Sequence, residues 1–270
     1  MTASYSWLLH VPELFSVRAP GNTCLSALRS PSGGTLEEPI NHSKGCGGIM
    51  RVAPVGLYFE TGKSGKYTIE QIDRIGAETA ALTHGHELGY LPAAALTHIL
   101  QRLSHDEISS LAEAVEDMKE HITGQFAGTS HLDQLIDRID QAVILSWKDI
   151  DDLTAIHRLG EGWVAEETLA IGLYCALKYE EDFDRALISA VNHGGDSDST
   201  GAITGNLLGA RLGLQGIPEK YLRNLELKDV ILEIADDLYF GCRISEYGSV
   251  EDEIWEQKYV YHTYTPVRSR

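Results

Sequence analysis

Apolar side chains recur at helical spacing through most of the chain after residue 68, and this pattern restricts the fold more than any other feature. Within Tyr67–Leu82, for example, Ile69, Ile72 and Ile75 lie near one face, with charged residues between them. The pattern predicts further helices at Leu91–Leu103, Ser104–His121, Leu132–Trp147, Glu166–Tyr179, Phe183–Val191, Ala202–Leu212 and Leu227–Phe240. Because no segment alternates for long like a half-buried strand, we predict an all-α fold in which residues 1–270 form a single compact multi-helix domain.

Two local signals refine this prediction. Ser104 and Glu107 have the spacing of a capping box, so a helix is expected to begin there. Val52–Phe59 is the best strand candidate, but a helix that starts at Ala53-Pro54 fits equally well because proline is favoured in the first helical turn.

The charge of the chain excludes some classes of partner. The 270 residues contain 22 Lys and Arg against 40 Asp and Glu, a net charge of −18, so neither nucleic acid nor an anionic membrane is expected as a partner. The N-terminus lacks the features of a signal peptide, and the four cysteines form no CxxC pair. These features predict a soluble, cytoplasmic protein with reduced thiols.

An acidic loop gives the sharpest chemical signal. Asp196 and Asp198 stand beside hydroxyl side chains in the glycine-flanked segment 193–201, which leads into an apolar helix. Such oxygen donors suit Mg²⁺, Mn²⁺ or Ca²⁺, although helix capping alone is an alternative. A calcium-binding EF-hand is excluded because Leu207 occupies its twelfth position, where glutamate is required.

A second loop, residues 41–51, has three glycines within four positions, at Gly45, Gly47 and Gly48. Glycines let backbone N–H groups approach an anion, and the nearby Lys44 and Arg51 would add charge, so the loop could bind a phosphate or pyrophosphate. The alternative is an ordinary tight turn. Cys46 fits a buried structural thiol better than a nucleophile because no base partner can be named.

His84 and His86 stand at a break between helices. A ring N–H here could reach a phosphate oxygen or a metal ion, while solvated or capping histidines are equally compatible with the sequence.

Taken together, these segments resemble the ADP-ribosylglycohydrolase family, which includes dinitrogenase-reductase-activating glycohydrolases and ADP-ribosyl-acceptor hydrolases. The matching segments follow one another in order over most of the chain. They are RAPGNTCLS (18–26), SKGCGGIMRVAP (43–54), LTHGHELGY (82–90), GWVAEE (162–167) and GGDSDSTGAITGNLLGA (194–210).

The resemblance implies an all-α fold that holds two divalent ions, Mg²⁺ or Mn²⁺, at the bottom of a cleft with ADP-ribose across them. It assigns half of the metal shell to Asp196, Asp198 and Ser199. It assigns substrate binding, chiefly at the phosphates, to Lys44, Gly45, Cys46, Gly47, Gly48 and His84. The metal would orient the distal ribose and a bridging water, and hydrolysis would release ADP-ribose.

The sequence departs from the family at its start. Relatives carry a Thr-Asp-Asp-Thr type motif that supplies the other metal ligands and the catalytic acid, whereas the region around Trp7 resembles sequence downstream of that motif. We therefore expect an N-terminally incomplete family domain whose catalytic residue is unknown.

Two functions follow from the resemblance. The first is a hydrolase that removes ADP-ribose from modified protein side chains, at an N- or O-glycosidic bond, or from a small ADP-ribose conjugate. The alternative is a catalytically silent, truncated member that binds ADP-ribose or acts as an interaction module, with self-association through exposed apolar faces. Generic hydrolysis of a phosphate ester ranks last because it leaves the RAPGNT and SKGCG segments without a role.

Overall fold

The computed structural model describes residues 19–30, 32–61, 67–105, 108, 110–241 and 252–261. Every regular element within these ranges is helical, and the β contact among them is an isolated antiparallel bridge between Gly45 and Val164, which confirms the all-α fold. The helices are α2 (Asn22–Arg29), η2 (Ile49–Arg51), α3 (Ala53–Tyr58), α4 (Ile69–Ala81), α5 (Glu87–His105), α6 (Leu111–Gln125), α7 (Leu132–Ser146), α8 (Asp152–Leu159), α9 (Ala165–Lys178), α10 (Phe183–Val191), α11 (Ser197–Leu212), η3 (Leu214–Gly216), α12 (Glu219–Leu222), α13 (Lys228–Phe240), α14 (Glu253–Trp255) and η4 (Glu256–Val260).

The chain divides into two compact units. One consists of Gly21–Tyr221, and the other combines residues 1–20 with residues 222–270. In the second unit, Lys258 forms ion pairs with Glu233 and Asp237, which join η4 to α13. A single domain over residues 1–270 stays a prediction. Residues 1–18, to which the expected N-terminal gap refers, lie outside the described residues.

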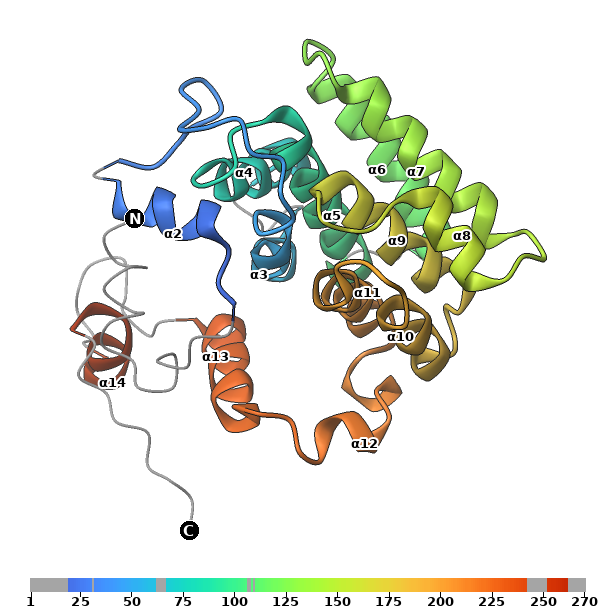
Figure 1. Ribbon diagram of the computed structural model, residues 1–270. Coiled ribbons are helices and arrows are strands. Elements are labelled where there is room, and N and C mark those ends of the chain that lie inside the picture. The colour runs from blue at the N-terminus through green and yellow to red at the C-terminus, as the bar shows by residue number, and fades with distance from the viewer. Residues whose placement is uncertain are drawn as a thin grey trace. The chain divides into compact units, whose positions relative to one another are not determined.

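Two buried helices form the centre of the larger unit. In α5, 14 of 19 residues are buried, and in α9, 11 of 14 are buried. Helices that are apolar nearly all round are typical of a protein core. α5 packs against α3, α4, α6, α7, α9 and α11, and Figure 1 shows the other labelled helices of this unit around it. Its run of small residues, Ala93–Ala95, is fully buried and lets neighbouring helices approach closely.

The observed helix ends correct one prediction and decide another. Ser104 lies inside the last turn of α5, and the next helix starts at Leu111, where the Ser110 side chain accepts a hydrogen bond from the Glu113 amide. The prediction that a helix begins with a capping box at Ser104 was therefore wrong, because Ser110 caps α6 instead. Residues 53–58 form α3 with proline in its first turn, so the helical alternative for Val52–Phe59 is confirmed.

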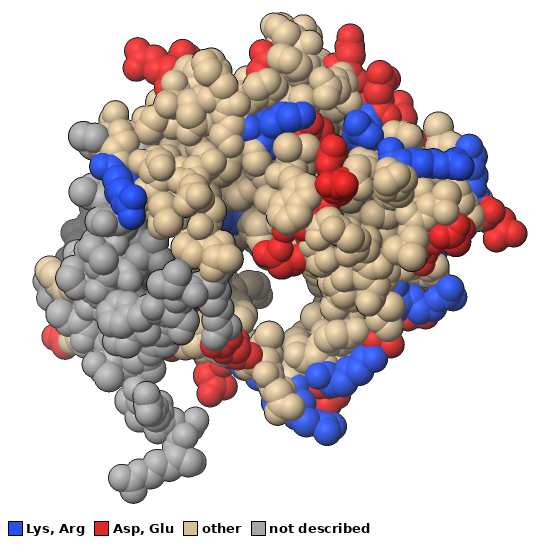
Figure 2. Space-filling view, in the orientation of Figure 1, with Lys and Arg blue, Asp and Glu red and all other residues tan. Residues whose placement is uncertain are grey.

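Surface and thiol features can also be compared with the sequence. No helix among the described residues combines the length and apolarity needed to cross a bilayer. Figure 2 shows acidic and basic side chains interspersed on the visible face. Cys24, Cys46 and Cys175 are free thiols, while Cys242 lies outside the described residues.

Candidate metal and phosphate site

The glycine loop is fastened to the segment that precedes α9. The Cys46 amide donates to the Trp163 carbonyl at 3.3 Å, and the Ala165 amide donates to the Lys44 carbonyl at 2.9 Å. With the Gly45–Val164 bridge, these bonds fix the backbone of the loop against the start of a buried helix. Residues more than 100 positions apart in the sequence thus form one wall of the site.

His84 packs directly beneath this loop and is 2% exposed. A Cβ atom placed on Gly47 would lie 3.2 Å from His84 Cε1 and 3.4 Å from its Nε2, which is tighter than an ordinary side-chain contact, so glycine favours this close approach. Burial, together with the charge of Arg51, lowers the pKa of His84 to about 4. The imidazole is therefore neutral at physiological pH, and His84 is not the solvated histidine that the sequence left open.

The proton on His84 can be placed from its neighbours. An Arg51 N–H donates to Thr83 Oγ1 at 2.6 Å, so the Thr83 hydroxyl can donate its own proton to His84 Nδ1, 2.7 Å away. His84 Nε2 then carries the ring proton and lies beside the glycine loop as a hydrogen-bond donor. This arrangement suits an anionic oxygen bound at the loop.

Arg51 does not serve the loop as a free cation. Its guanidinium donates to the carbonyl oxygens of Gly47, Thr79 and Ala80 as well as to Thr83. These acceptors occupy its donors, while its positive charge remains beside the loop and helps to lower the pKa of His84, so the expectation that it adds charge for a phosphate stays a prediction. Arg51 also holds the glycine loop to the end of α4.

His86 has a capping role. Its backbone carbonyl accepts from the Gly89 amide at 2.7 Å, and its Nδ1 accepts from the Leu88 amide at 3.0 Å. These bonds satisfy amide groups that have no partner within the first turn of α5. The capping alternative for His86 is therefore confirmed.

The acidic loop packs its backbone closely against Glu161, in the segment that precedes α9. The Asp196 amide donates to the Glu161 carbonyl at 2.7 Å, and a Cβ atom on Gly195 would lie 1.9 Å from that same oxygen. Only glycine fits at this position. Asp196 is the N-cap residue of α11, yet its side chain makes no capping hydrogen bond. Capping therefore does not explain this carboxylate.

The Asp196 carboxylate instead faces the glycine loop. Its Oδ2 accepts from the Cys46 thiol at 2.9 Å and from the Ser199 hydroxyl at 2.9 Å. Ser199 also lies 3.0 Å from the sulfur of Met50 and is 1% exposed. The structure thus brings the two loops singled out by the sequence into direct contact.

The two aspartates share one local charge environment. A hydrogen bond with the Asp196 carboxyl, together with partial burial and the Asp196 charge, raises the pKa of Asp198. This raised pKa is expected for a carboxyl beside a second negative charge. A divalent cation would offset that repulsion, and the assignment of Asp196, Asp198 and Ser199 as its oxygen ligands stays a prediction.

Cys46 is poorly suited to nucleophilic chemistry. Burial and the neighbouring Asp196 carboxylate raise the pKa of its thiol to about 12. A thiol of this kind stays protonated and acts as a hydrogen-bond donor. The preference for a structural thiol is in keeping with this environment.

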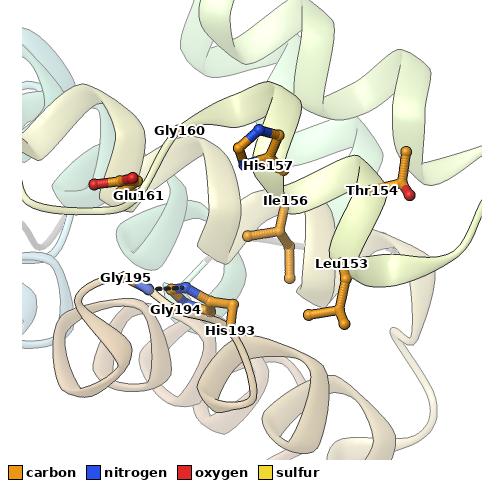
Figure 3. A pocket seen from close by; sticks show the side chains of 9 residues that line it. All are labelled: Leu153, Thr154, Ile156, His157, Gly160, Glu161, His193, Gly194 and Gly195. Atoms are coloured by element: carbon orange, nitrogen blue, oxygen red, sulfur yellow. Dashed lines mark hydrogen bonds between the residues drawn. The ribbon is translucent and has the colours of Figure 1, made fainter.

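A cavity of about 430 Å³ lies beside the acidic loop (Figure 3). Leu153 and Ile156 of α8 line it on one side, and His193 and Gly195 on the other, with Glu161 at one end. None of the site residues predicted from the sequence lines this cavity, although Asp196 directly follows Gly195. The cavity thus adjoins the acidic loop from the side of α8.

Comparison with known proteins decides the family. A sequence model of the ADP-ribosylglycohydrolase family matches residues 2–246. The chain belongs to this family. The resemblance inferred from its motifs is confirmed over most of the sequence.

Individual relatives of this ADP-ribosylglycohydrolase chain are more distant. ADP-ribosylhydrolase ARH3 of Mus musculus is 27% identical over 210 residues, which cover 68% of this chain and 53% of that protein. An uncharacterised protein of Archaeoglobus fulgidus is 29% identical over 196 residues, covering 72% and 57%. The ADP-ribosyl-[dinitrogen reductase] glycohydrolase of Rhodospirillum rubrum is 46% identical over 48 residues, covering 18% and 16%. The longer matches span only slightly more than half of each relative.

The family motifs did not reveal every residue at the site. Glu166 is 1% exposed and pairs with Lys44 through Oε1, while its Oε2 has no hydrogen-bond partner among the described atoms. Trp163, next to the glycine loop, is 57% exposed. Both residues lie in the GWVAEE segment (162–167). The match of this segment to the family pattern was the one feature of the sequence that could have pointed to them.

Proposed function

We propose that this ADP-ribosylglycohydrolase chain removes ADP-ribose from a modified protein side chain by hydrolysis. The contact of Asp196 with Cys46 carries the proposal, because it unites a candidate metal loop with a candidate pyrophosphate loop. Family membership supports it, as do the names of two relatives, an ADP-ribosylhydrolase and a glycohydrolase of ADP-ribosyl-[dinitrogen reductase].

The acidic loop would hold the metal. Asp196, Asp198 and Ser199 present only oxygen donors, which favour Mg²⁺ or Mn²⁺ over softer ions. When bound, a divalent cation would polarise and orient the distal ribose of ADP-ribose. The Cys46 thiol and the Ser199 hydroxyl hold the Asp196 carboxylate in place, so the protein fixes the direction of this ligand before the cation arrives.

The glycine loop would hold the pyrophosphate. Gly45 and Gly47 pack closely against His84, whose Nε2–H would donate to a phosphate oxygen bound at the loop without carrying a positive charge. Lys44 supplies the nearby cation, and its pairing with the buried Glu166 fixes where the ammonium group lies. The proposal therefore gives each loop a separate part of the substrate.

The proposal can be tested by measuring ADP-ribose release from arginine- and serine-linked ADP-ribosylated proteins in the presence of Mg²⁺ or Mn²⁺. Asp196→Ala should lower kcat by at least about 100-fold, because it removes a positioned metal ligand. Asp133→Ala, which changes an exposed aspartate on α7, is the matched control and should retain activity. Equal turnover by the Asp196 variant, or no release from either linkage by the wild-type chain, would contradict the proposal.

A further inference from the structure

A second group of metal-ligating side chains lies away from the glycine and acidic loops, where α4, α5 and α6 pack together (Figure 1). It consists of Asp73 on α4, His98 on α5, and Asp117 and His121 on α6. His98 is 12 residues beyond His86, about 18 Å along the helix axis. The role proposed for the acidic loop uses none of these side chains.

His98 is fully buried between two carboxylates. Its Nδ1 lies 2.9 Å from Asp73 Oδ2, and its Nε2 lies 2.8 Å from Asp117 Oδ2. Asp73 is also fully buried, and its second oxygen, Oδ1, has no hydrogen-bond partner among the described atoms. Burial raises the pKa of Asp73, while the hydrogen bond with His98 lowers it; when Asp73 is ionised, it accepts the Nδ1 proton of His98. His98 Nε2 then faces Asp117 with its lone pair, unless a second proton or a cation lies between them.

His121 completes the group at its outer edge. Its Nδ1 lies 2.9 Å from the backbone carbonyl of Asp117, and because a carbonyl only accepts, Nδ1 carries the ring proton. Nε2 of His121 is therefore unprotonated in the neutral ring and can bind a metal. One ligand atom from each of His98, Asp117 and His121 lies within 4.8 Å of the others. His121 Nδ1 lies 3.7 Å from Asp117 Oδ1, and these two side chains are only 27% and 29% exposed, so the group is partly shielded from water.

The local charge also favours a cation. Asp73 and Asp117 bring two negative charges, and Arg102, whose Nε donates to Asp117 Oδ2 at 2.6 Å, offsets one of them. When both aspartates are ionised, one negative charge therefore remains in a largely buried place. A proton taken up by the group or a metal ion at His98 Nε2 can balance this charge. In the second case Asp73 holds the imidazole from behind, an arrangement commonly found at histidine-bound zinc.

We propose that His98, Asp117 and His121 bind a transition-metal ion of the Zn²⁺ class, and that this ion fastens α5 to α6. Two imidazoles and one carboxylate suit Zn²⁺ better than Mg²⁺, which prefers oxygen ligands. Water can complete the coordination from the exposed side of His121 and Asp117. The ion would be structural, and its chemistry differs from that of the oxygen donors at Asp196 and Asp198.

The test uses the full chain freed of metal with a chelator and then titrated with Zn²⁺ alone against a chromophoric competitor. We expect one tightly bound Zn²⁺ per chain and a higher melting temperature in its presence. His121→Ala should weaken this binding and abolish the thermal shift, and Asp73→Asn should weaken the binding at least about 10-fold. Titration with Co²⁺ should give the absorption of a four-coordinate ion without a thiolate band.

Two control variants locate the ion. His105→Ala changes a histidine at the end of α5 whose ring contacts the Leu57 carbonyl, and Asp196→Ala alters the acidic loop; both should bind Zn²⁺ as the wild-type chain does. Because His121 is partly exposed, its variant should keep the wild-type circular dichroism. Absence of bound Zn²⁺, or unchanged binding by a folded His121→Ala variant, would overturn the proposal. The test involves no turnover, so it is independent of the proposed hydrolase activity.

Discussion

Asp152, at the first position of α8, offers the sharpest test of the structure through stability. Its carboxylate accepts from Lys178 at 2.8 Å, from Tyr174 at 2.7 Å and from Tyr179 at 2.9 Å, and also from Ser189. Burial opposes the charged form, but these donors outweigh it and lower the pKa of Asp152 from 3.8 to about 2. One carboxylate thereby links α8, α9 and α10.

The expected effect of Asp152→Asn can be worked out from that pKa. A displacement from 3.8 to about 2 corresponds to about 2.5 kcal/mol of unfolding free energy. The side chain is 25% exposed, so solvent screening reduces the charge-dependent part to about 1.5 kcal/mol. We therefore expect a loss of at least about 1.5 kcal/mol at pH 7, because the new amide also places N–H groups opposite existing donors.

The sign of the pH dependence is fixed by the direction of the shift. A carboxylate with a lowered folded-state pKa stabilises the fold above its ordinary pKa, and this stabilisation is lost as the pH falls through the folded value. The wild-type advantage over Asp152→Asn should thus be constant between about pH 7 and pH 5 and fall by about half of its charge-dependent part at pH 3.

Urea unfolding followed by circular dichroism at several pH values measures this difference. Asp149→Asn, a change at an exposed aspartate three residues earlier, is the control for loss of one negative charge and should differ from wild type by less than about 0.5 kcal/mol. A difference between wild type and Asp152→Asn that is the same at pH 7 and pH 3 would refute the reasoning, since it would show that the network does not depend on charge.

Three further predictions concern the site and the core. Gly47→Val should weaken ADP-ribose binding at least about 10-fold in calorimetry, because even a Cβ atom there lies 3.0 Å from Cys24 Sγ and 3.2 Å from His84; unchanged affinity would contradict the packing described. Since the pKa of His84 is about 4, the ring stays neutral and should add no pH dependence to ADP-ribose affinity between about pH 8 and pH 6. If the affinity of the wild-type chain changed over this range and that of His84→Gln did not, the ring would not be neutral. Leu96→Ala, at a fully buried position of α5, should lower the free energy of unfolding in urea by about 2–5 kcal/mol, and a loss below about 1 kcal/mol would show that Leu96 is not tightly packed.

The parts of the fold that could be predicted were those with a strong local signal. The periodic segments gave α4, α7, α10 and α13 with ends displaced by at most two residues. The eight-residue helices α2 and α8 were not anticipated, because two turns are too short for a periodic pattern to stand out. The segment between α5 and α6 contains more than one serine with capping chemistry, and packing, which the sequence does not display, selected Ser110.

The candidate site shows the same division between local chemistry and packing. The glycine loop and the acidic loop could be recognised because their residue types are unusual in a helical protein. The bond from Cys46 to Asp196 spans 150 positions, and the pairing of Lys44 with Glu166 spans 122. Such pairs depend on how α9 and α11 pack, so no local pattern could specify them. The acceptors of Arg51 could not be predicted for the same reason, since the Thr79 and Ala80 carbonyls belong to another helix.

His98 shows what a sequence can still reveal about a distant partner. It follows LPAAALT in one of the most apolar helices of the chain, where a histidine has no solvent to satisfy its ring nitrogens. The surrounding residues therefore require that polar partners come from other helices, although they do not specify which ones. The structure supplies Asp73 and Asp117 from α4 and α6, at separations of 25 and 19 residues. When both carboxylates are ionised, Arg102 balances only one of them, so the group is a candidate for a metal ion as well as for a hydrogen-bonded core.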